Sequence, residues 1–174
     1  MNKHILSGRL GSQLRRSTAR NRAGRTKPTV DKKYVVGLTD GEGCFYIVVR
    51  NSPAYRAGAM IGLHFHIKMQ KADRELLVKV KNTLGCGGVY FQNEKRLNHT
   101  QCYRYTVSSN ADIITKIIPF FETYPLESYS KLKNFELFRR AAIIVAKGQH
   151  LSKKGVDEIR SLKSQMNKKT VGLA

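Results

Sequence analysis

The chain has 174 residues, with 32 lysines and arginines against 12 aspartates and glutamates, which gives a formal net charge of +20. The length suits one domain with tails, and a hydrophobic content of 41% is enough for a folded core, which excludes wholesale disorder. No run of about 18 apolar residues occurs, which excludes a membrane-spanning helix. Because so large a positive surplus attracts polyanions, the composition predicts a nucleic-acid partner.

The positive charge is concentrated at the N-terminus. Residues 1–30 hold eight basic residues and no acid, whereas residues 31–174 carry a net charge of +12. We expect a basic, disordered extension over 1–29, the folded domain over 30–168 and a tail over 169–174. An acid-free head rich in arginine and serine is typical of organellar targeting peptides, so we expect a mitochondrion first and a plastid second. A basic arm lying along phosphates, or a stretch with neither role, is the alternative for the head.

The three cysteines form no C-x-x-C pair, which favours a reducing compartment and argues against a zinc finger or a disulfide scaffold.

Hydrophobic spacing predicts an α+β domain in the order helix, two strands, helix, two strands, helix, and then two further helices. The expected helices cover residues 29–40, 73–84, 110–118, 132–146 and the stretch from 152 onward, and the expected strands cover 45–50, 61–70, 89–93 and 101–107. Thr29 or Asp31 can cap the first helix and Asn110 the third, which Pro119 is expected to interrupt. Because the strands come in consecutive pairs, the sheet is expected to be antiparallel.

One face of the predicted sheet is polar. Residues 61–70 alternate between apolar and polar side chains, as in a strand with one buried face. Donors, amides and cations gather on the outward face, at Tyr46, Arg50, His64, His66, Lys68, Gln70, Gln92 and Arg104. A β-ribbon fits the DNA major groove, where arginine, lysine and glutamine read base edges. An ordinary solvated face is the alternative, and the excess of positive charge favours nucleic acid.

Asp40 and Glu42 stand out among the 12 acids because they lie two residues apart in a glycine-framed turn. Phosphodiester hydrolysis needs a hard divalent cation, and Mg²⁺ prefers carboxylate, carbonyl and water ligands. Glu42 alone supplies too few ligands, but two copies in a dimer, together with DNA phosphates, could complete a site. The alternative is that Asp40 caps its own helix and Glu42 is solvated. Gly37 and Gly41, four residues apart, would let a second backbone approach this helix, either from a partner or from the chain's own sheet.

Residues 35–43, VVGLTDGEG, resemble the LAGLIDADG motif of homing endonucleases, in the variant that ends in DGEG. Further stretches resemble that family in the same order along the chain, at residues 44–47, 66–74, 119–121, 130–135 and 150–167. Together they cover about residues 30–168. The resemblance implies an αββαββα core with a curved antiparallel four-stranded sheet and additional C-terminal helices.

The same resemblance implies roles for individual residues. The catalytic residues would be Glu42, Gln70 and Lys131, with Glu42 and the carbonyl group of Gly41 as the Mg²⁺ ligands. Gln70 would order water at the active site. Lys131 would lie near the scissile phosphate, and Lys133 is the alternative if the match slips by a residue or two. Asp40 would close the helix end without binding the metal.

Only one motif is present, whereas monomeric members of the family carry two. One copy would hold half an active site, so we expect a homodimer on a near-palindromic target, formed through Val36, Gly37 and Gly41. The activity implied is site-specific cutting of double-stranded DNA that leaves staggered 3′ ends, with the polar sheet face on the DNA. An intron maturase on the same fold, which binds intron RNA, is the alternative, but retention of the three catalytic residues favours the nuclease. A catalytically inactive DNA-binding regulator would not need Glu42.

Overall fold

The computed structural model of the protein describes residues 27–95 and 100–166. The expected extension up to residue 26 and the tail over 169–174 lie outside the described residues. The helices are α1 (Lys32–Glu42), α2 (Arg74–Leu84), α3 (Asn110–Asp112), α4 (Ile118–Thr123), α5 (Tyr129–Ala146) and α6 (Lys153–Gln165), with short helical turns η1 (Lys71–Asp73), η2 (Ile113–Ile117) and η3 (Gln149–Leu151). The strands are β1 (Gly43–Asn51), β2 (Ala59–Gln70), β3 (Gly88–Gln92) and β4 (Cys102–Val107). This order confirms the predicted α+β class. No helix in the described part is long and apolar enough to cross a membrane.

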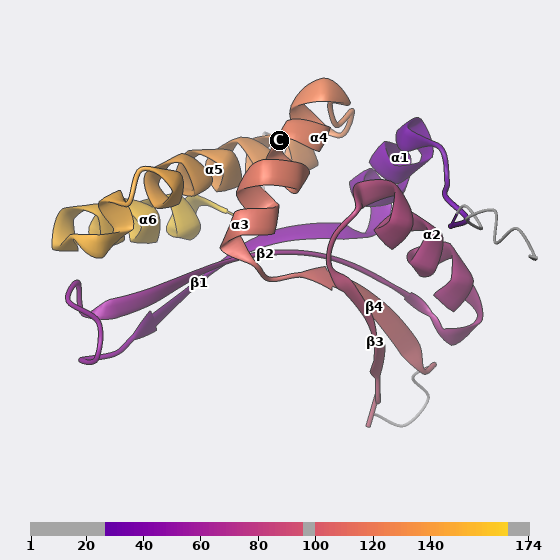
Figure 1. The fold of residues 1–174 in the computed structure, drawn as a ribbon, viewed down its shortest axis with the longest axis horizontal. Helices are drawn as coiled ribbons and strands as arrows, with labels where there is room; N and C mark the ends of the chain where they lie inside the picture. The colour runs from indigo at the N-terminus through magenta and orange to yellow at the C-terminus, as the bar shows by residue number, and fades with distance from the viewer. Residues whose placement is uncertain (1–26, 96–99, 167–174) are drawn as a thin grey trace, which may run out of the picture.

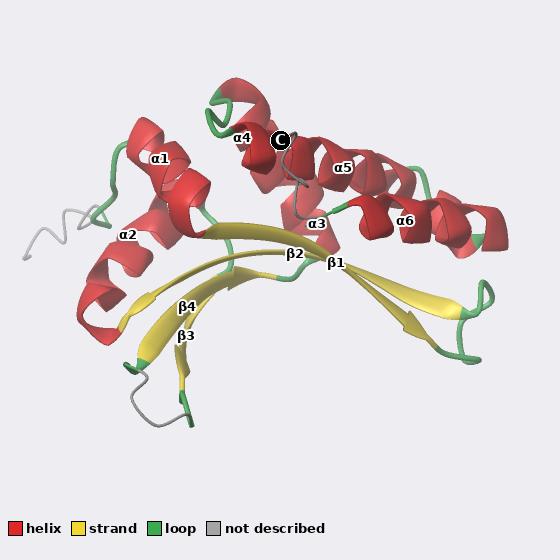
Figure 2. Ribbon diagram, turned by 180° about the vertical axis from the view of Figure 1, so that it is seen from behind, coloured by secondary structure: helices red, strands yellow, loops and turns green. Residues whose placement is uncertain are grey.

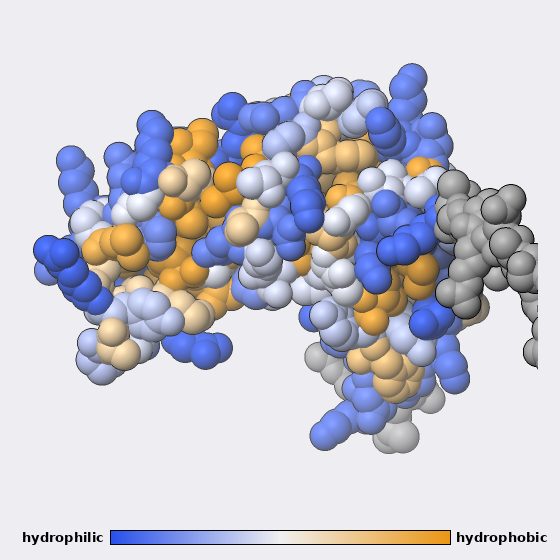
Figure 3. Space-filling view, viewed as in Figure 1, coloured by the Kyte–Doolittle hydropathy of each residue, from blue (hydrophilic) through white to orange (hydrophobic). Residues whose placement is uncertain are grey.

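The four strands form one antiparallel sheet in the order β1-β2-β4-β3. The helices cover one face of this sheet and leave the other face open (Figures 1 and 2). The sheet is curved, because the β1–β2 hairpin and the β3–β4 pair slope away from the middle in opposite directions. The result is an arch, and the space-filling view shows the hollow beneath it (Figure 3). The predicted curved four-stranded sheet is therefore confirmed.

The predicted alternation along β2 is confirmed by its burial. Leu63, Phe65 and Ile67 are fully buried under the helices, while the residues between them are partly exposed on the open face. In β4 the same alternation buries Tyr105 and Val107. Because side chains in a strand point to opposite faces in turn, one register fixes which residues face the helices and which face outward.

An aromatic cluster joins the sheet to the helical layer. The ring of Phe45, on β1, lies 4.9 Å from that of Phe65 on β2, centroid to centroid. It also lies 5.4 Å from Phe121 on α4, and 5.4 and 5.3 Å from Phe135 and Phe138 on α5. These contacts fix α4 and α5 over the first two strands, at about 0.5–1.5 kcal/mol per aromatic pair beyond the buried area.

The helix α1 begins at the second of its two expected caps. The carboxylate of Asp31 accepts hydrogen bonds from the backbone N–H groups of Lys33 (2.8 Å) and Tyr34 (3.3 Å). The helix does not stop at Gly41, as the glycine-rich turn predicted, but continues through Glu42. The chain then enters β1 at once, because a Cβ atom on Gly43 would lie 2.7 Å from the carbonyl oxygen of Thr39, and only glycine leaves room for so tight an exit.

The third helical stretch differs from its prediction in two ways. Its cap is Ser109, whose hydroxyl accepts from the N–H of Asp112 (3.2 Å). The Asn110 side chain instead bonds β2, accepting from the N–H of Leu63 (2.9 Å) and donating to the carbonyl of Ile61 (3.3 Å). The stretch also continues past Pro119, because a π-helical turn gives way to α4 there and the proline falls in the first turn of α4, where its missing N–H is tolerated.

The corner between α5 and α6 depends on a close backbone approach. Ser152, where the last helix was expected to begin, caps α6, since its hydroxyl accepts from the N–H of Gly155 (3.2 Å). A Cβ atom on Gly155 would lie 2.6 Å from the carbonyl carbon of Gln149. The first turn of α6 therefore packs directly on η3, which positions Val156 and Ile159 in the core.

Replacing Gly155 with alanine should destabilise the protein, although alanine is the better helix former. Overpacking of this kind costs about 1–3 kcal/mol, which exceeds the helix-propensity gain of about 1 kcal/mol. The midpoint of urea unfolding should fall. In the control variant Glu158→Ala, at an exposed position of the same helix, it should change within about 0.5 kcal/mol. Equal stability of Gly155→Ala and the wild type would mean that the corner relaxes freely.

Candidate active site

The candidate site is built on the C-terminal end of α1. The last carbonyl groups of a helix have no partner within it, and the helix dipole makes this end negative. Here the Gly43 N–H satisfies the carbonyl of Thr39, which leaves that of Gly41 without an intrahelical donor. Glu42 is exposed at the same end. A carboxylate and a free carbonyl at the negative end of a helix make a favourable place for a cation.

A cavity of about 410 Å³ lies beside this helix end. Its lining residues are Glu42, Lys68, Met69, Gln70, Asp73 and Cys102. Two of the three predicted catalytic residues, Glu42 and Gln70, therefore face the same space. Asp73, which immediately precedes α2, adds a second carboxylate that the sequence analysis treated only as the beginning of a helix.

Lys131 reaches the same corner from α5. Its ammonium group donates to the carbonyl of Gly43 at 2.5 Å, next to Glu42. Lys133, the alternative in the sequence, is exposed. Of the two lysines, Lys131 is therefore the one that the fold holds at the end of the motif.

Asp40 has a role that the sequence did not predict. Its carboxylate does not cap α1; it accepts hydrogen bonds from the backbone N–H groups of Glu127 (3.0 Å) and Ser128 (3.2 Å). Ser128 is the N-cap residue of α5 and makes no cap bond with its own side chain. Asp40 thus anchors the beginning of α5 to the motif helix, three residues before Lys131.

The donors at this corner suit Mg²⁺, which prefers hard oxygen ligands. Glu42 and Asp73 bring carboxylates, Gln70 an amide and Gly41 a carbonyl. Yet in the part of the chain that the structure describes, no three histidine, cysteine, aspartate or glutamate side chains lie close enough together to hold a metal ion.

The predicted DNA-contacting residues share the open face of the sheet. Directly opposite residues in an antiparallel pair lie on one face. Between β1 and β2 the pairs on the open face include Cys44–His66, Tyr46–His64 and Arg50–Met60. Between β2 and β4 they are His66–Thr106, Lys68–Arg104 and Gln70–Cys102, and between β4 and β3 they include Arg104–Tyr90 and Cys102–Gln92. All eight residues predicted to face outward, Tyr46, Arg50, His64, His66, Lys68, Gln70, Gln92 and Arg104, belong to this set.

The middle of this face carries an ordered cluster of rings. Tyr46 stacks on His64 with centroids 4.8 Å apart and meets His66 edge-on at 5.2 Å. Burial, and then the nearby charges of Arg104 and His64, lower the pKa of His66 to about 4. His66 is therefore neutral near pH 7, with one donor and one acceptor nitrogen. The Nδ1 atom of His66 and the Nε atom of Arg104 are buried and have no hydrogen-bond partner.

The open face also includes residues that the sequence analysis missed. Tyr90, which is 59% exposed, lies directly opposite Arg104. Alternation along β3, with Gln92 already placed outward, was the signal that could have found it. Glu94 follows the same strand and forms an ion pair with Lys68. No sequence spacing indicates that contact, because the pairing of β2 with β4 and of β4 with β3 creates it.

The predicted interface residues of α1 do not all behave alike. Gly37 and Gly41 are exposed, and nothing lies within 4 Å of a Cβ atom built on either. Packing against the chain's own sheet, one of the two readings of these glycines, is therefore wrong. Val36 is 7% exposed and belongs largely to the chain's own core, although it also lines a cavity of about 510 Å³ with Lys33 and Gly37.

Comparison with known proteins places these features in a family. The chain matches the LAGLIDADG endonuclease family over residues 35–142. A probable intron-encoded endonuclease 2 of Neurospora crassa is 26% identical over 141 residues, which are 79% of this chain and 29% of that protein. An uncharacterised 50.9 kDa protein in ND4 intron 1 of Podospora anserina is 31% identical over 127 residues, or 72% of this chain and 26% of that protein. The chain thus spans between about a quarter and a third of the length of these relatives.

Solved structures show the same likeness. The homing endonuclease I-TnaI is 32% identical, with a TM-score of 0.71 over 80% of this chain and 90% of that one. The LAGLIDADG homing endonuclease I-SmaMI bound to cleaved DNA is 28% identical, with a TM-score of 0.72 over 86% of this chain and 47% of that one.

The matched region contains most of α1 with the motif, all four strands and most of α5, so it includes Glu42, Gln70, Lys131 and the open face. The chain therefore belongs to the LAGLIDADG endonuclease family.

Proposed function

We propose that this protein is a site-specific double-stranded DNA endonuclease that acts as a homodimer on a near-palindromic site. The observation that carries the proposal is one corner of the fold. There Glu42 and Gln70 line a common cavity, Lys131 is held beside Glu42, and the open polar face of the sheet continues from the cavity. The carboxylate of Glu42, the amide of Gln70 and the ammonium group of Lys131 therefore lie at the edge of a surface that fits the DNA major groove.

In this proposal Glu42 and the Gly41 carbonyl are the groups that would hold Mg²⁺. When bound, the cation supplies Lewis-acid stabilisation of the phosphate and lowers the pKa of a coordinated water. Gln70, across the cavity, orders the attacking water. The Lys131 ammonium stabilises charge that develops on the phosphate. Cutting of the two strands across the minor groove leaves the staggered 3′ ends that the family resemblance implies.

The charge of the folded part supports a DNA partner. Residues 31–174 carry a net charge of +12, and a dimer doubles it over one site. Binding that releases many counterions weakens steeply with added salt. The open face offers donors and amides to base edges, whereas the carboxylates of the described ion pairs in the helical layer are held by neighbouring cations.

The homodimer is supported by the two open glycines of α1. A glycine inside a helix lowers helix stability by about 1 kcal/mol relative to alanine. Nothing lies within 4 Å of a Cβ atom built on Gly37 or Gly41, so close packing within the chain does not explain either glycine. They leave the outer side of α1 bare, so a second α1 can approach closely. That approach would bring two copies of Glu42 together and complete the ligand set that one chain lacks.

The cellular setting proposed is an intron-encoded protein of a mitochondrion. The relatives named above support it, since one is called intron-encoded and another is named for an ND4 intron. A maturase acting on intron RNA is the competing outcome. It has no need of a carboxylate, an amide and a lysine gathered at one corner.

Replacing Glu42 with glutamine should abolish DNA cutting and leave DNA binding intact. Glutamine keeps the size of the side chain but loses the charge that holds a cation. The experiment incubates the protein with Mg²⁺ and the uninterrupted form of its host gene, and measures both cleavage and gel-shift affinity. Cleavage should fall by more than the roughly 10- to 100-fold that loss of an outer-shell partner of a metal costs, because Glu42 is proposed to bind the metal directly.

The matched control is Glu158→Gln, which removes an equal charge from an exposed position on α6. It should cut like the wild type. If the wild-type protein leaves this DNA uncut and binds intron RNA tightly, the nuclease proposal is wrong and the maturase is favoured.

Replacing Gly37 with leucine should separate folding from assembly. The side chain enters open space in the monomer and improves helix propensity by about 1 kcal/mol, so the melting temperature should not fall. The same side chain should hold two α1 helices apart. The sedimenting species should shift from dimer to monomer, with Gly37→Ala giving an intermediate effect. An unchanged dimer in Gly37→Leu would exclude this face as the interface.

A further inference from the structure

One acidic side chain stands on the face proposed to contact DNA. Glu94 pairs with Lys68, a residue of the open face that also lines the active-site cavity. Four other ion pairs of the described residues join side chains of the helical layer instead, at Arg74–Glu75, Lys116–Asp112, Arg139–Glu122 and Arg160–Asp157. A carboxylate facing a polyanion costs repulsion, so its position needs a reason.

The local charge gives part of that reason. Lys68 lies directly opposite Arg104 in the β2–β4 ladder, and like charges in such a pair repel. Glu94 compensates for this repulsion, because its carboxylate forms an ion pair with the ammonium group of Lys68. The lysine side chain is 38% exposed and the glutamate 22% exposed, so both can still reach a ligand above the sheet.

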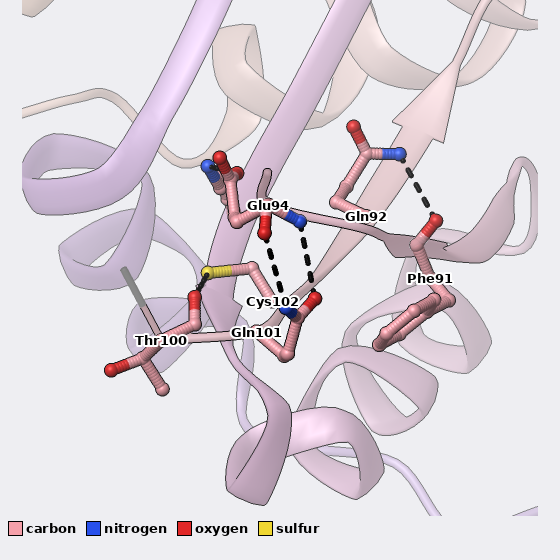
Figure 4. Close-up of polar contacts among 7 residues, drawn as sticks. Phe91, Gln92, Glu94, Thr100, Gln101 and Cys102 are labelled. Carbon is pink, nitrogen blue, oxygen red and sulfur yellow. Dashed lines mark hydrogen bonds and ion pairs between the residues drawn. The ribbon is translucent and has the colours of Figure 1, made fainter. Parts of the chain in front are cut away.

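Gln101, which lies just before β4, holds the backbone of Glu94 in place. The N–H of Glu94 donates to the side-chain oxygen of Gln101 (3.1 Å), and the side-chain nitrogen of Gln101 donates back to the carbonyl of Glu94 (3.2 Å). Figure 4 shows this reciprocal pair beside Gln92 and Cys102, two residues of the open face. The acid is thus positioned by the ends of two strands before any DNA is present.

A fixed donor beside a fixed acceptor matches one base pair. In the major groove guanine presents two acceptors, N7 and O6, and cytosine presents the N4 amino donor. A lysine ammonium has three N–H groups, so Lys68 keeps two for guanine after it binds Glu94. The carboxylate of Glu94 accepts only, which suits the amino group of cytosine and opposes acceptor atoms at that position.

We propose that Lys68 and Glu94 form one specificity-determining unit that reads a single G·C base pair, with Lys68 on guanine and Glu94 on cytosine. This inference rests on the proposed function, because it needs the open face to lie in the major groove. Two other roles are possible for such a pair. Lys68 would bind a phosphate if Glu94 only buffered its charge, and the pair would be purely structural if neither residue touched DNA.

The test measures binding to a library of random-sequence DNA duplexes, with EDTA present so that no cutting occurs. Bound duplexes are sequenced for the wild type, Glu94→Gln, Lys68→Met and the double variant. The wild type should prefer G·C over the other pairs at one position of a half-site by roughly 5- to 150-fold. Each single variant should lose that preference and keep the others, and the double variant should lose no more than either single one.

Glu75→Gln is the control, because it removes an equal charge from an exposed ion pair on α2. It should leave the whole profile unchanged. A uniform change of affinity over all sequences, in either Lys68→Met or Glu94→Gln, would assign the pair to phosphate or charge buffering and overturn the inference. A sequence preference that both variants preserve would also overturn the inference. A wild-type protein with no sequence preference would contradict the proposed function itself, which separates the two failures.

Discussion

The hydrogen bonds from the backbone of Glu127 and Ser128 to Asp40 tie together the parts of this fold that matter for chemistry. They join the end of α1 to the beginning of α5, segments that are 87 and 88 residues apart in the chain. Lys131 follows within one helical turn and reaches the carbonyl of Gly43. On the other side of that glycine the chain turns at once into β1, where Phe45 enters the aromatic core. This corner thus fixes the positions of Glu42, Lys131 and β1 relative to one another.

The same corner gathers the oxygen donors of the candidate metal site. Its own chain supplies oxygen donors, but within the described residues it supplies no group of three metal-binding side chains. Next to it, two helix glycines face open space. In the proposed homodimer, a second copy that packs on α1 would offset this cost in helix propensity and would bring a second Glu42 to the corner. The strong positive charge of the folded part then faces one DNA duplex from both copies.

The strands, the outward face of the sheet and the motif could be predicted from sequence, because hydrophobic periodicity and residue spacing encode them. Alternation along residues 61–70 predicted which side chains of β2 face outward, and the motif located Glu42. Tertiary contacts set the rest. The partners of Asp40 and the approach of Lys131 to Gly43 join distant segments, and no local pattern encodes them. The ion pair of Glu94 with Lys68 depends on the order of the strands. The passage of a helix through Pro119 required a π-helical turn, which hydrophobic periodicity does not reveal.

The most direct measurement is the mass of the complex with a cognate duplex, determined by native mass spectrometry with Ca²⁺ in place of Mg²⁺ so that binding proceeds without cutting. Two copies of the 19.7 kDa chain on one duplex are expected, because in the proposed homodimer each copy brings one Glu42 to the metal site. A stable complex with one chain per duplex, which cuts its DNA once Mg²⁺ replaces Ca²⁺, would contradict the central claim that two copies build a single site.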